Sequence, residues 1–320
     1  MSWPGVTQRR VATNGIELNI AEAGEGPLVL LLHGFPESWY SWRHQFAPLA
    51  AAGYHVVAPD MRGYGKSDKP PNITDYVQTE VIKDIIGLIP ALGYDNAVVI
   101  GHDWGAPTAW ATALFHPGKV RAVGGLSVPF LPRLPVQPMP MMREMFKGQF
   151  FYQLYFQEPG VAEAEFEKGM YTALRKFLIM AAGETDLTKL TPKTEDDDLL
   201  TSLPYPETLP GWLTDADLDF YVSEFTASGM RGPINYYRNH DLHWQLTEGA
   251  PMEIHQPAMF IAGTADGVVM MAAAAIEAMP HFVKDLRINR MIPGIGHWTQ
   301  QEAPEAVNET ILEFLRNIDT

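Results

Sequence analysis

Short apolar runs alternate with segments of helical periodicity at both ends of the chain. Apolar, β-branched runs typical of buried strands lie at residues 27–32, 54–60, 96–102, 120–128, 257–263 and 286–291. Apolar residues recur at helical spacing over residues 39–51, 76–92, 104–115, 268–279 and 303–315. Two further strands joined at Asn14-Gly15 predict a hairpin near the N-terminus. Strands that alternate with helices predict an α/β fold, with a mostly parallel central sheet covered on both faces.

The pattern changes in the middle of the chain. Five prolines fall between residues 129 and 140, and the segment from Met141 to about His243 indicates short helices and no obvious strand. An all-helical insertion between two strands of an α/β sheet is typical of a lid. We therefore expect a core domain made of residues 1–130 and 245–320, interrupted by a helical cap domain of residues 131–244.

Residues 96–105 hold the first candidate for chemistry. The apolar run passes directly into a helical segment through Gly101-His102-Asp103-Trp104-Gly105, which is the pattern of a nucleophile elbow. We expect the two glycines to leave room where strand and helix crowd, and Asp103 to project into a site. A carboxylate at a helix N-terminus is stabilised in its charged form, and it can attack carbon to give an ester. An ordinary helix cap is the alternative explanation for Asp103.

Two later positions complete a candidate triad. Asp266 follows the strand at 257–263, and His297 lies in a glycine-rich loop after the strand at 286–291. Nucleophile, acid and histidine then occur in the order found in α/β-hydrolases, at strand ends where open α/β sheets place their ligands. An imidazole held by a carboxylate is a general base, which here would activate the water that hydrolyses the ester. A helix cap and a loop hydrogen bond are the alternative roles for these two residues.

A short turn supplies the second half of the candidate site. His33-Gly34-Phe35-Pro36 follows directly after the strand at 27–32, at the position that provides half of the oxyanion hole in this type of fold. The backbone N–H groups of Phe35 and Trp104 would then point at one oxygen. An ordinary turn is the alternative. We also count His33, Pro36 and Trp104 among the candidate substrate contacts.

Composition excludes several classes of function. The 320-residue chain carries a formal charge of −15, and an acidic surface repels phosphate backbones and anionic lipid, so we expect neither nucleic acid nor membrane as a partner. The chain has no cysteine, and its ten histidines show no metal-ligand spacing. We expect no metal, no signal peptide and no membrane span, and hence a cytoplasmic protein.

Longer stretches of the chain resemble the soluble epoxide hydrolases of the α/β-hydrolase superfamily. The resemblance covers nearly the whole chain and is carried by residues 33–42 (HGFPESWYSW), 101–105 (GHDWG), 152–160 (YQLYFQEPG) and 231–239 (RGPINYYRN). It implies a cofactor-independent enzyme that opens an epoxide to a vicinal diol, with a small-molecule epoxide and water as its partners. It leaves the oligomeric state open between monomer and homodimer.

The resemblance also implies a role for each residue of the site. Asp103 matches the nucleophile, His297 the base and Asp266 its acidic partner. Tyr152 and Tyr237 match two lid tyrosines that bind the epoxide oxygen and donate a proton as the ring opens. Phenols suit this role because they are acidic enough to stabilise an alkoxide and yet stay protonated at pH 7.

Three details of the resemblance concern neighbouring residues. The peptide before Pro36 is cis in that family. Tyr155 and Tyr236 lie close to the two matched tyrosines in the sequence, and alignment with the family motif assigns both to packing. Tyr155 is in addition a candidate substrate contact.

Two other functions fit parts of the sequence. A haloalkane or haloacid dehalogenase uses the same Asp-His-Asp chemistry, but its leaving halide is stabilised by Trp or Asn N–H groups rather than by two phenols. A non-catalytic binding protein of the same fold would lack the base or the acid, whereas every catalytic position is filled here. The lid is rich in Met, Phe and Leu, which favours a substrate with an apolar arm.

Overall fold

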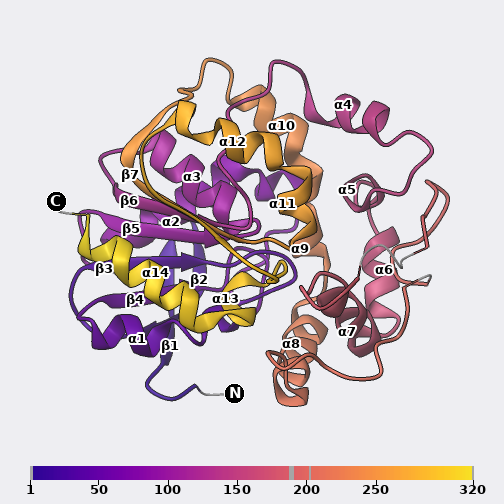
Figure 1. Ribbon diagram of the computed structural model, residues 1–320, viewed down its shortest axis with the longest axis horizontal. Coiled ribbons are helices and arrows are strands. Elements are labelled where there is room, and N and C mark those ends of the chain that lie inside the picture. Colours follow the sequence, from indigo (N-terminus) through magenta and orange to yellow (C-terminus); the bar gives the residue numbers. More distant parts are fainter. Residues whose placement is uncertain (1–2, 187–190, 202, 319–320) are drawn as a thin grey trace.

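The computed structural model describes residues 3–186, 191–201 and 203–318, and an eight-stranded sheet forms its centre (Figure 1). The strands lie in the order β1-β2-β4-β3-β5-β6-β7-β8. Their bounds are β1 Thr7–Thr13, β2 Ile16–Ala23, β3 Leu28–Leu32, β4 His55–Pro59, β5 Ala97–His102, β6 Val120–Leu126, β7 Ile254–Gly263 and β8 Val283–Ile292. β2 pairs antiparallel with β1 and β4, and the other neighbours pair parallel. The predicted mostly parallel sheet is confirmed.

The hairpin between β1 and β2 has the predicted turn. Thr13 lies opposite Ile16, so Asn14 and Gly15 form a two-residue connection. Both have positive φ, 44° and 76°, as a turn that matches the twist of the strands requires.

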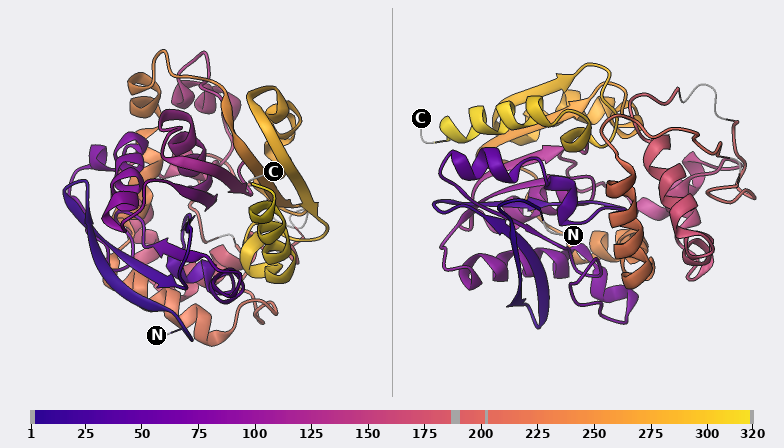
Figure 2. Two further views of the ribbon diagram at one scale, coloured as in Figure 1. Left: turned by 90° about the vertical axis from the view of Figure 1, so that its left-hand side faces the viewer. Right: turned by 90° about the horizontal axis from the view of Figure 1, so that it is seen from below.

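Helices cover both faces of the sheet, as expected. α2 packs with α3 on one face, and α1 packs with α14 on the other (Figure 2). The helices before the insertion are η1 Trp39–Trp42, α1 Phe46–Ala51, η2 Ile73–Tyr76, α2 Gln78–Ala91 and α3 Gly105–Phe115. Those after β7 are α11 Gly267–Met271, α12 Ala273–Phe282, α13 Thr299–Glu302 and α14 Pro304–Arg316.

Two helices that the periodicity predicts as continuous are divided in the structure. Residues 39–51 form η1 and α1, and residues 268–279 lie in α11 and α12, whereas the helix predicted at residues 303–315 is confirmed as α14. Proline explains where α1 and α14 begin. Pro48 lies in the first turn of α1 and Pro304 is the first residue of α14, positions where a missing N–H costs no hydrogen bond.

Between β6 and β7 the described residues form helices and no strand, which confirms the predicted helical insertion. Its helices are α4 Pro138–Met145, α5 Tyr152–Tyr155, α6 Val161–Glu167, α7 Met170–Met180 and α8 Asp215–Ser228; α9 Arg231–Asn235, η4 Tyr236–Asn239 and α10 His240–Leu246 then lead back to β7. In Figure 1, α4–α8 project from the side of the sheet domain. The boundary expected at residue 244 falls within α10.

The parallel strands determine where a site can form. β3 and β5 lie side by side, with every residue buried. Because β3, β5, β6, β7 and β8 run in one direction, the residues that follow them meet at one edge of the sheet. The turn after β3 and the elbow after β5 are therefore neighbours.

Candidate active site

Asp103 lies in the sharp turn between β5 and α3. Its φ is +48°, in the left-handed region that residues other than glycine seldom adopt. The strand and the helix almost touch here: a Cβ on Gly101 would lie 1.9 Å from the carbonyl oxygen of Gly105, and a Cβ on Gly105 would lie 2.1 Å from that of Leu32. The structure thus has the strand–turn–helix geometry expected of an elbow, and the close approach requires both glycines.

The Asp103 carboxylate is held from two sides. The backbone N–H of Phe35 donates a hydrogen bond to Oδ1 at 2.7 Å, and Nε2 of His297 lies 3.5 Å from Oδ2. A Cβ on Gly34 would lie 2.3 Å from Oδ1, so only glycine allows this approach. Trp104, the second expected oxyanion donor, precedes the first turn of α3. One predicted N–H donor and the predicted base therefore meet at the predicted nucleophile.

The opposite side of the His297 ring faces a carboxylate and a hydroxyl. Nδ1 lies 3.2 Å from both oxygens of Asp266 and 2.9 Å from Oγ of Ser127. The Ser127 hydroxyl donates to Oδ2 of Asp266 at 2.5 Å. Because Nδ1 faces acceptors, it carries a proton, and Nε2 is directed at Asp103. Asp266 also accepts from the backbone N–H of Val268 at 2.8 Å, so it caps α11 and supports the histidine at once.

Charge inside the site consists of two carboxylates with an imidazole between them. Burial opposes the ionisation of Asp103 and Asp266, but His297 outweighs it and holds the pKa of each below its usual range. Burial also lowers the pKa of His297, and the two carboxylates reverse this and raise that pKa well above 6.5. We therefore expect both carboxylates to be ionised and His297 to be protonated when the cavity holds no ligand.

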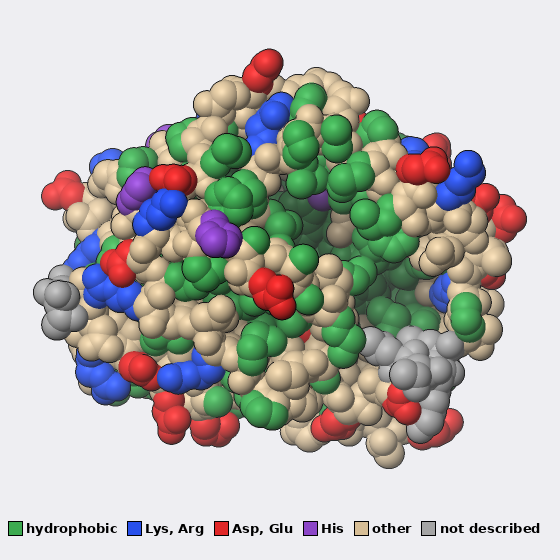
Figure 3. Space-filling model, turned by 45° about the horizontal axis from the view of Figure 1, so that its top comes forward, with side chains coloured by type: hydrophobic (Ala, Val, Ile, Leu, Met, Phe, Trp, Pro, Cys, Tyr) green, Lys and Arg blue, Asp and Glu red, His purple; other side chains and the backbone are tan. Residues whose placement is uncertain are grey.

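A cavity of about 630 Å³ lies over this group of residues. Asp103 and Trp104 line it from the elbow, and Tyr152 of α5 and Tyr237 of η4 line it from the helical insertion. The two tyrosine rings are 5.7 Å apart at their centroids and inclined by 79°. Most other lining residues are apolar, and Figure 3 shows a hollow whose walls are mainly hydrophobic side chains. The cavity therefore suits an apolar ligand with a reactive polar group.

Both tyrosine hydroxyls keep their protons in this surrounding. Burial, and then the charge of Asp103, raise the pKa of Tyr152 and of Tyr237 far above the usual value of 10. Nε2 of Gln153 donates to the Tyr152 oxygen at 3.0 Å. Because that oxygen already accepts a hydrogen bond, the Tyr152 proton is available to a different acceptor.

The comparisons with known proteins agree with this geometry. A family model described as the alpha/beta hydrolase fold matches residues 27–304. Epoxide hydrolase A of Mycobacterium tuberculosis is 42% identical over 320 residues, which cover 98% of either chain. The solved structure of epoxide hydrolase A from Mycobacterium thermoresistibile has a TM-score of 0.93 and 43% identity, with 98% of both chains covered. The chain belongs to the cofactor-independent epoxide hydrolases of the α/β-hydrolase fold. An epoxide hydrolase from an endophytic Streptomyces also aligns, with a TM-score of 0.95 and 41% identity over 99% of this chain and 97% of the other.

Two expected substrate contacts of this epoxide hydrolase, His33 and Pro36, are not among the residues that line the cavity. Nδ1 of His33 bonds the backbone oxygen of Gly34 at 2.9 Å, and Nε2 accepts from the backbone N–H of Met61 at 2.9 Å. Both ring nitrogens are therefore occupied by backbone. The Phe35–Pro36 peptide is cis, as the resemblance implies. These residues shape the turn that presents the Phe35 N–H.

The neighbouring lid tyrosines also point elsewhere. The hydroxyl of Tyr155 donates to Glu165 at 2.8 Å, and that of Tyr236 donates to the backbone oxygen of Arg62 at 2.9 Å. Neither is among the lining residues of the cavity. The geometry thus assigns both to packing, and of the four expected substrate contacts only Trp104 lines the cavity.

A buried network behind the triad was not expected from the sequence. Nδ1 of His102 lies 2.8 Å from Oε2 of Glu37, and its Nε2 lies 2.7 Å from the backbone oxygen of His297. Glu37 also accepts from the backbone N–H of Gly34 at 3.1 Å and from Nε2 of Gln301 at 2.9 Å. The network joins the turn at residues 33–37, the elbow at residues 101–105 and the loop that carries His297. Its only sequence signal is that His102 and Glu37 belong to the stretches that carry the family resemblance.

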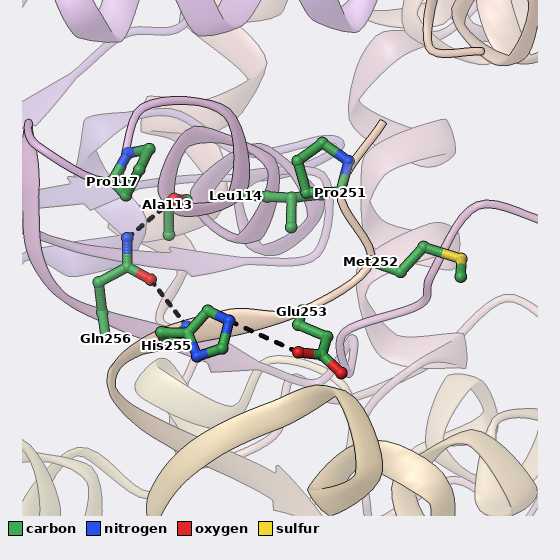
Figure 4. Close-up of a pocket in the computed structure, with 8 residues that line it drawn as sticks. All are labelled: Ala113, Leu114, Pro117, Pro251, Met252, Glu253, His255 and Gln256. Atoms are coloured by element: carbon green, nitrogen blue, oxygen red, sulfur yellow. Dashed lines mark hydrogen bonds and ion pairs between the residues drawn. The ribbon is translucent and has the colours of Figure 1, made fainter. Parts of the chain in front are cut away.

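A second cavity lies beside α3 and the start of β7 (Figure 4). It has a volume of about 570 Å³ and contains none of the catalytic candidates; Glu253 and His255, 3.5 Å apart, are its titratable groups. Among the described residues, no group of three or more histidine or acidic side chains could hold a metal ion. No helix in the described part of the chain is long and apolar enough to cross a membrane.

Proposed function

We propose that this enzyme converts an epoxide into a vicinal diol through a covalent ester on Asp103. One observation carries the proposal: the Asp103 carboxylate contacts the His297 imidazole and lies in the same apolar cavity as Tyr152 and Tyr237. A nucleophile, a base and two acids thus surround one point that an apolar substrate can reach. Residues 131–244 act as the cap that brings the tyrosines to the core.

In the first half-reaction an oxygen of Asp103 attacks one carbon of the epoxide, and the bond from that carbon to the ring oxygen breaks. The ring oxygen takes the electron pair and a proton from Tyr152 or Tyr237, and the other phenol stabilises it by a hydrogen bond. Donors placed where negative charge develops lower the barrier. The phenolate regains a proton from water, which leaves a neutral hydroxyalkyl ester.

In the second half-reaction Nε2 of His297 takes a proton from water as its oxygen attacks the carbonyl carbon of the ester. The carbonyl oxygen becomes negative and accepts a hydrogen bond from the Phe35 N–H, which is 2.7 Å from Oδ1 in the structure. The bond to the substrate oxygen then breaks, that oxygen takes the proton from His297, and the diol leaves. The new carboxyl group of Asp103 gives its proton to His297, which restores the carboxylate and the imidazolium of the resting state.

Ester formation itself prepares His297 to act as a base. The pKa of His297 is raised by the charges of both Asp266 and Asp103. Once Asp103 is an ester it carries no charge, so one of the two negative charges that favour the imidazolium is gone. The pKa of His297 therefore falls. His297 then releases its proton to solvent, while Asp266 continues to orient the ring.

A single turnover in ¹⁸O-enriched water tests the covalent route. With enzyme in excess, the new oxygen of the first diol comes from Asp103, so that diol is unlabelled and the peptide that contains Asp103 gains the label. In later turnovers the diol becomes labelled. A labelled diol in the first turnover means that water attacks the epoxide directly, which contradicts the proposal.

Two variants separate the half-reactions. His297→Gln should form the ester and fail to hydrolyse it, so its mass increases by that of the substrate. Asp103→Ala should form no adduct and is the matched negative control. Wild-type turnover by either variant contradicts the assigned roles. Haloalkanes with the same carbon skeletons, tested in parallel, should react far more slowly, because two phenols serve an alkoxide better than a halide.

A further inference from the structure

Three residues that line the active-site cavity carry a buried side-chain nitrogen without a hydrogen-bond partner among the described residues. The nitrogens are Nε2 of His240, Nδ1 of His243 and Nε2 of Gln78; Oε1 of Gln153, next to Tyr152 in the chain, is a fourth unpartnered atom of the lining residues. The histidines belong to α10 and Gln78 begins α2, two helices that contact each other. Buried polar groups without partners are costly and uncommon. Three of them on neighbouring helices, in a cavity whose other lining residues are mostly apolar, indicate that a ligand completes their hydrogen bonds.

The histidines continue the face of the chain that carries Tyr237. Tyr237, His240 and His243 follow one another at intervals of three residues through η4 and α10, and so lie along one side. A helical rise places each about 5 Å beyond the one before. The His240 ring stacks on Trp104 with centroids 5.4 Å apart, and Trp104 meets the Tyr237 ring at 5.1 Å. We call His240, His243 and Gln78 the polar wall of the cavity. Only the Trp104 ring separates the start of this wall, at His240, from Tyr237.

Neighbouring groups leave this wall uncharged. Asp241 accepts from the backbone N–H of Met139 at 3.0 Å, and the Arg133 guanidinium lies over the Trp244 ring, 4.0 Å from its centroid. Burial lowers the pKa of His240 and of His243 to about 4. Each ring is therefore neutral at pH 7, with one N–H donor and one acceptor nitrogen. The wall offers neutral hydrogen bonds rather than a positive charge.

We propose that His240, His243 and Gln78 form a subsite for one uncharged oxygen, a hydroxyl, ether or carbonyl, on the side chain of the substrate. The inference rests on the proposed function, because it places that oxygen relative to an epoxide held at Asp103. The substrate is then an epoxide whose apolar chain carries a neutral oxygen at a distance that reaches past Trp104.

A series of epoxides of equal chain length tests the subsite. In each member one methylene of a 1,2-epoxyalkane is replaced by an ether oxygen at a successive position, and kcat/KM is compared with that of the all-carbon parent. For the wild type, the ratio of kcat/KM for the ether to kcat/KM for the parent should reach a maximum when the ether oxygen stands at one or two adjacent positions. A terminal hydroxyl at the same distance, which can donate as well as accept, should give a ratio at least as high.

Substitutions in the polar wall then test whether its residues cause the maximum in the ether-to-parent ratio of kcat/KM. His240→Phe keeps a ring on Trp104 but removes both nitrogens, and it should lower the maximum roughly threefold to tenfold, the range expected for one neutral hydrogen bond. His243→Leu and Gln78→Leu should act in the same direction. Met142→Leu changes a lining residue without polar atoms and should alter ether and parent equally. The ratio is measured on one enzyme preparation, so partial loss of folded protein cancels.

The possible outcomes separate this inference from the proposed function. A flat wild-type profile, or a maximum that survives all three substitutions, overturns the subsite and assigns the nitrogens to bound water only. A wild-type enzyme that turns over neither the parent nor the ethers contradicts the proposed function instead. A maximum that falls only in the three wall variants supports the subsite.

Discussion

Removal of the Ser127 hydroxyl tests how His297, the proposed base, is held in place. The hydroxyl donates to Oδ2 of Asp266 and lies 2.9 Å from Nδ1 of His297, and Ser127 is fully buried. A hydrogen bond to a charged group contributes about 1.5–3 kcal/mol. Ser127→Ala deprives a buried carboxylate of this donor, so we expect the free energy of unfolding to fall by about 1.5–3 kcal/mol.

Ser41→Ala is the matched control, because it deletes the same atom at another fully buried position. The Ser41 hydroxyl donates to the backbone oxygen of Ser38 at 3.1 Å, a neutral acceptor. Its loss should cost about 0.5–1.5 kcal/mol. Urea unfolding of both variants and the wild type at pH 7 measures the difference. If Ser127→Ala loses no more stability than Ser41→Ala, the bond to Asp266 does not have the strength that its charge implies.

The same variant should affect one half-reaction only. Ser127 touches the Asp266–His297 pair. In the proposed mechanism this pair serves ester hydrolysis, and the ester itself forms at Asp103. If the lost bond acts fully in the transition state, hydrolysis slows by about 10–100-fold, while ester formation keeps its rate. Rapid quenching followed by mass measurement of the enzyme gives both rates. Equal slowing of the two steps refutes the reasoning, since it points to a general distortion of the site.

Other predictions follow from the same geometry. Tyr152→Phe and Tyr237→Phe should each slow ester formation by about 10–100-fold, and the double variant should be slower than either; single-turnover rates check this, and an unchanged double variant contradicts it. In the proposed mechanism hydrolysis needs neutral His297, whose pKa the two carboxylates raise, whereas ester formation needs ionised Asp103, whose pKa His297 lowers. As the pH falls, the ester should therefore accumulate in quenched samples; a constant ester fraction argues against this order of ionisation. Gly105→Ala should reduce the free energy of unfolding by about 3 kcal/mol because its Cβ meets backbone of β3. Gly118→Ala, whose Cβ would meet nothing within 4 Å, should unfold in urea like the wild type.

Local patterns were sufficient for most of the fold. The alternation of apolar runs and helical segments predicted the parallel sheet, and Asn14-Gly15 predicted the hairpin, because side-chain periodicity and turn chemistry act between residues close in sequence. Periodicity alone predicted one continuous helix where the structure has two. Residues 39–51 divide into two helices, since an apolar face can continue through a break in the hydrogen bonds of the backbone.

The candidate triad could also be predicted, because each member follows a strand of the sheet and parallel strands end at one edge. The direction in which each side chain points could not be predicted from the sequence. Tyr155 is as plausible a substrate contact as Tyr152 in the sequence, yet its hydroxyl bonds Glu165. The spacing of residues along a chain does not say which of two adjacent aromatic rings faces a cavity and which faces a carboxylate.

The sequence by itself determined the order of strands and helices, the elbow and the set of chemical groups that this enzyme has available. Only the tertiary structure decided which groups meet: Ser127 with Asp266, Glu37 with His102, and Gln78 with the wall of α10. These contacts join residues 65 or more positions apart in the chain. Hydrogen bonds act over about 3 Å, so distant residues can form them only after packing has brought their elements together.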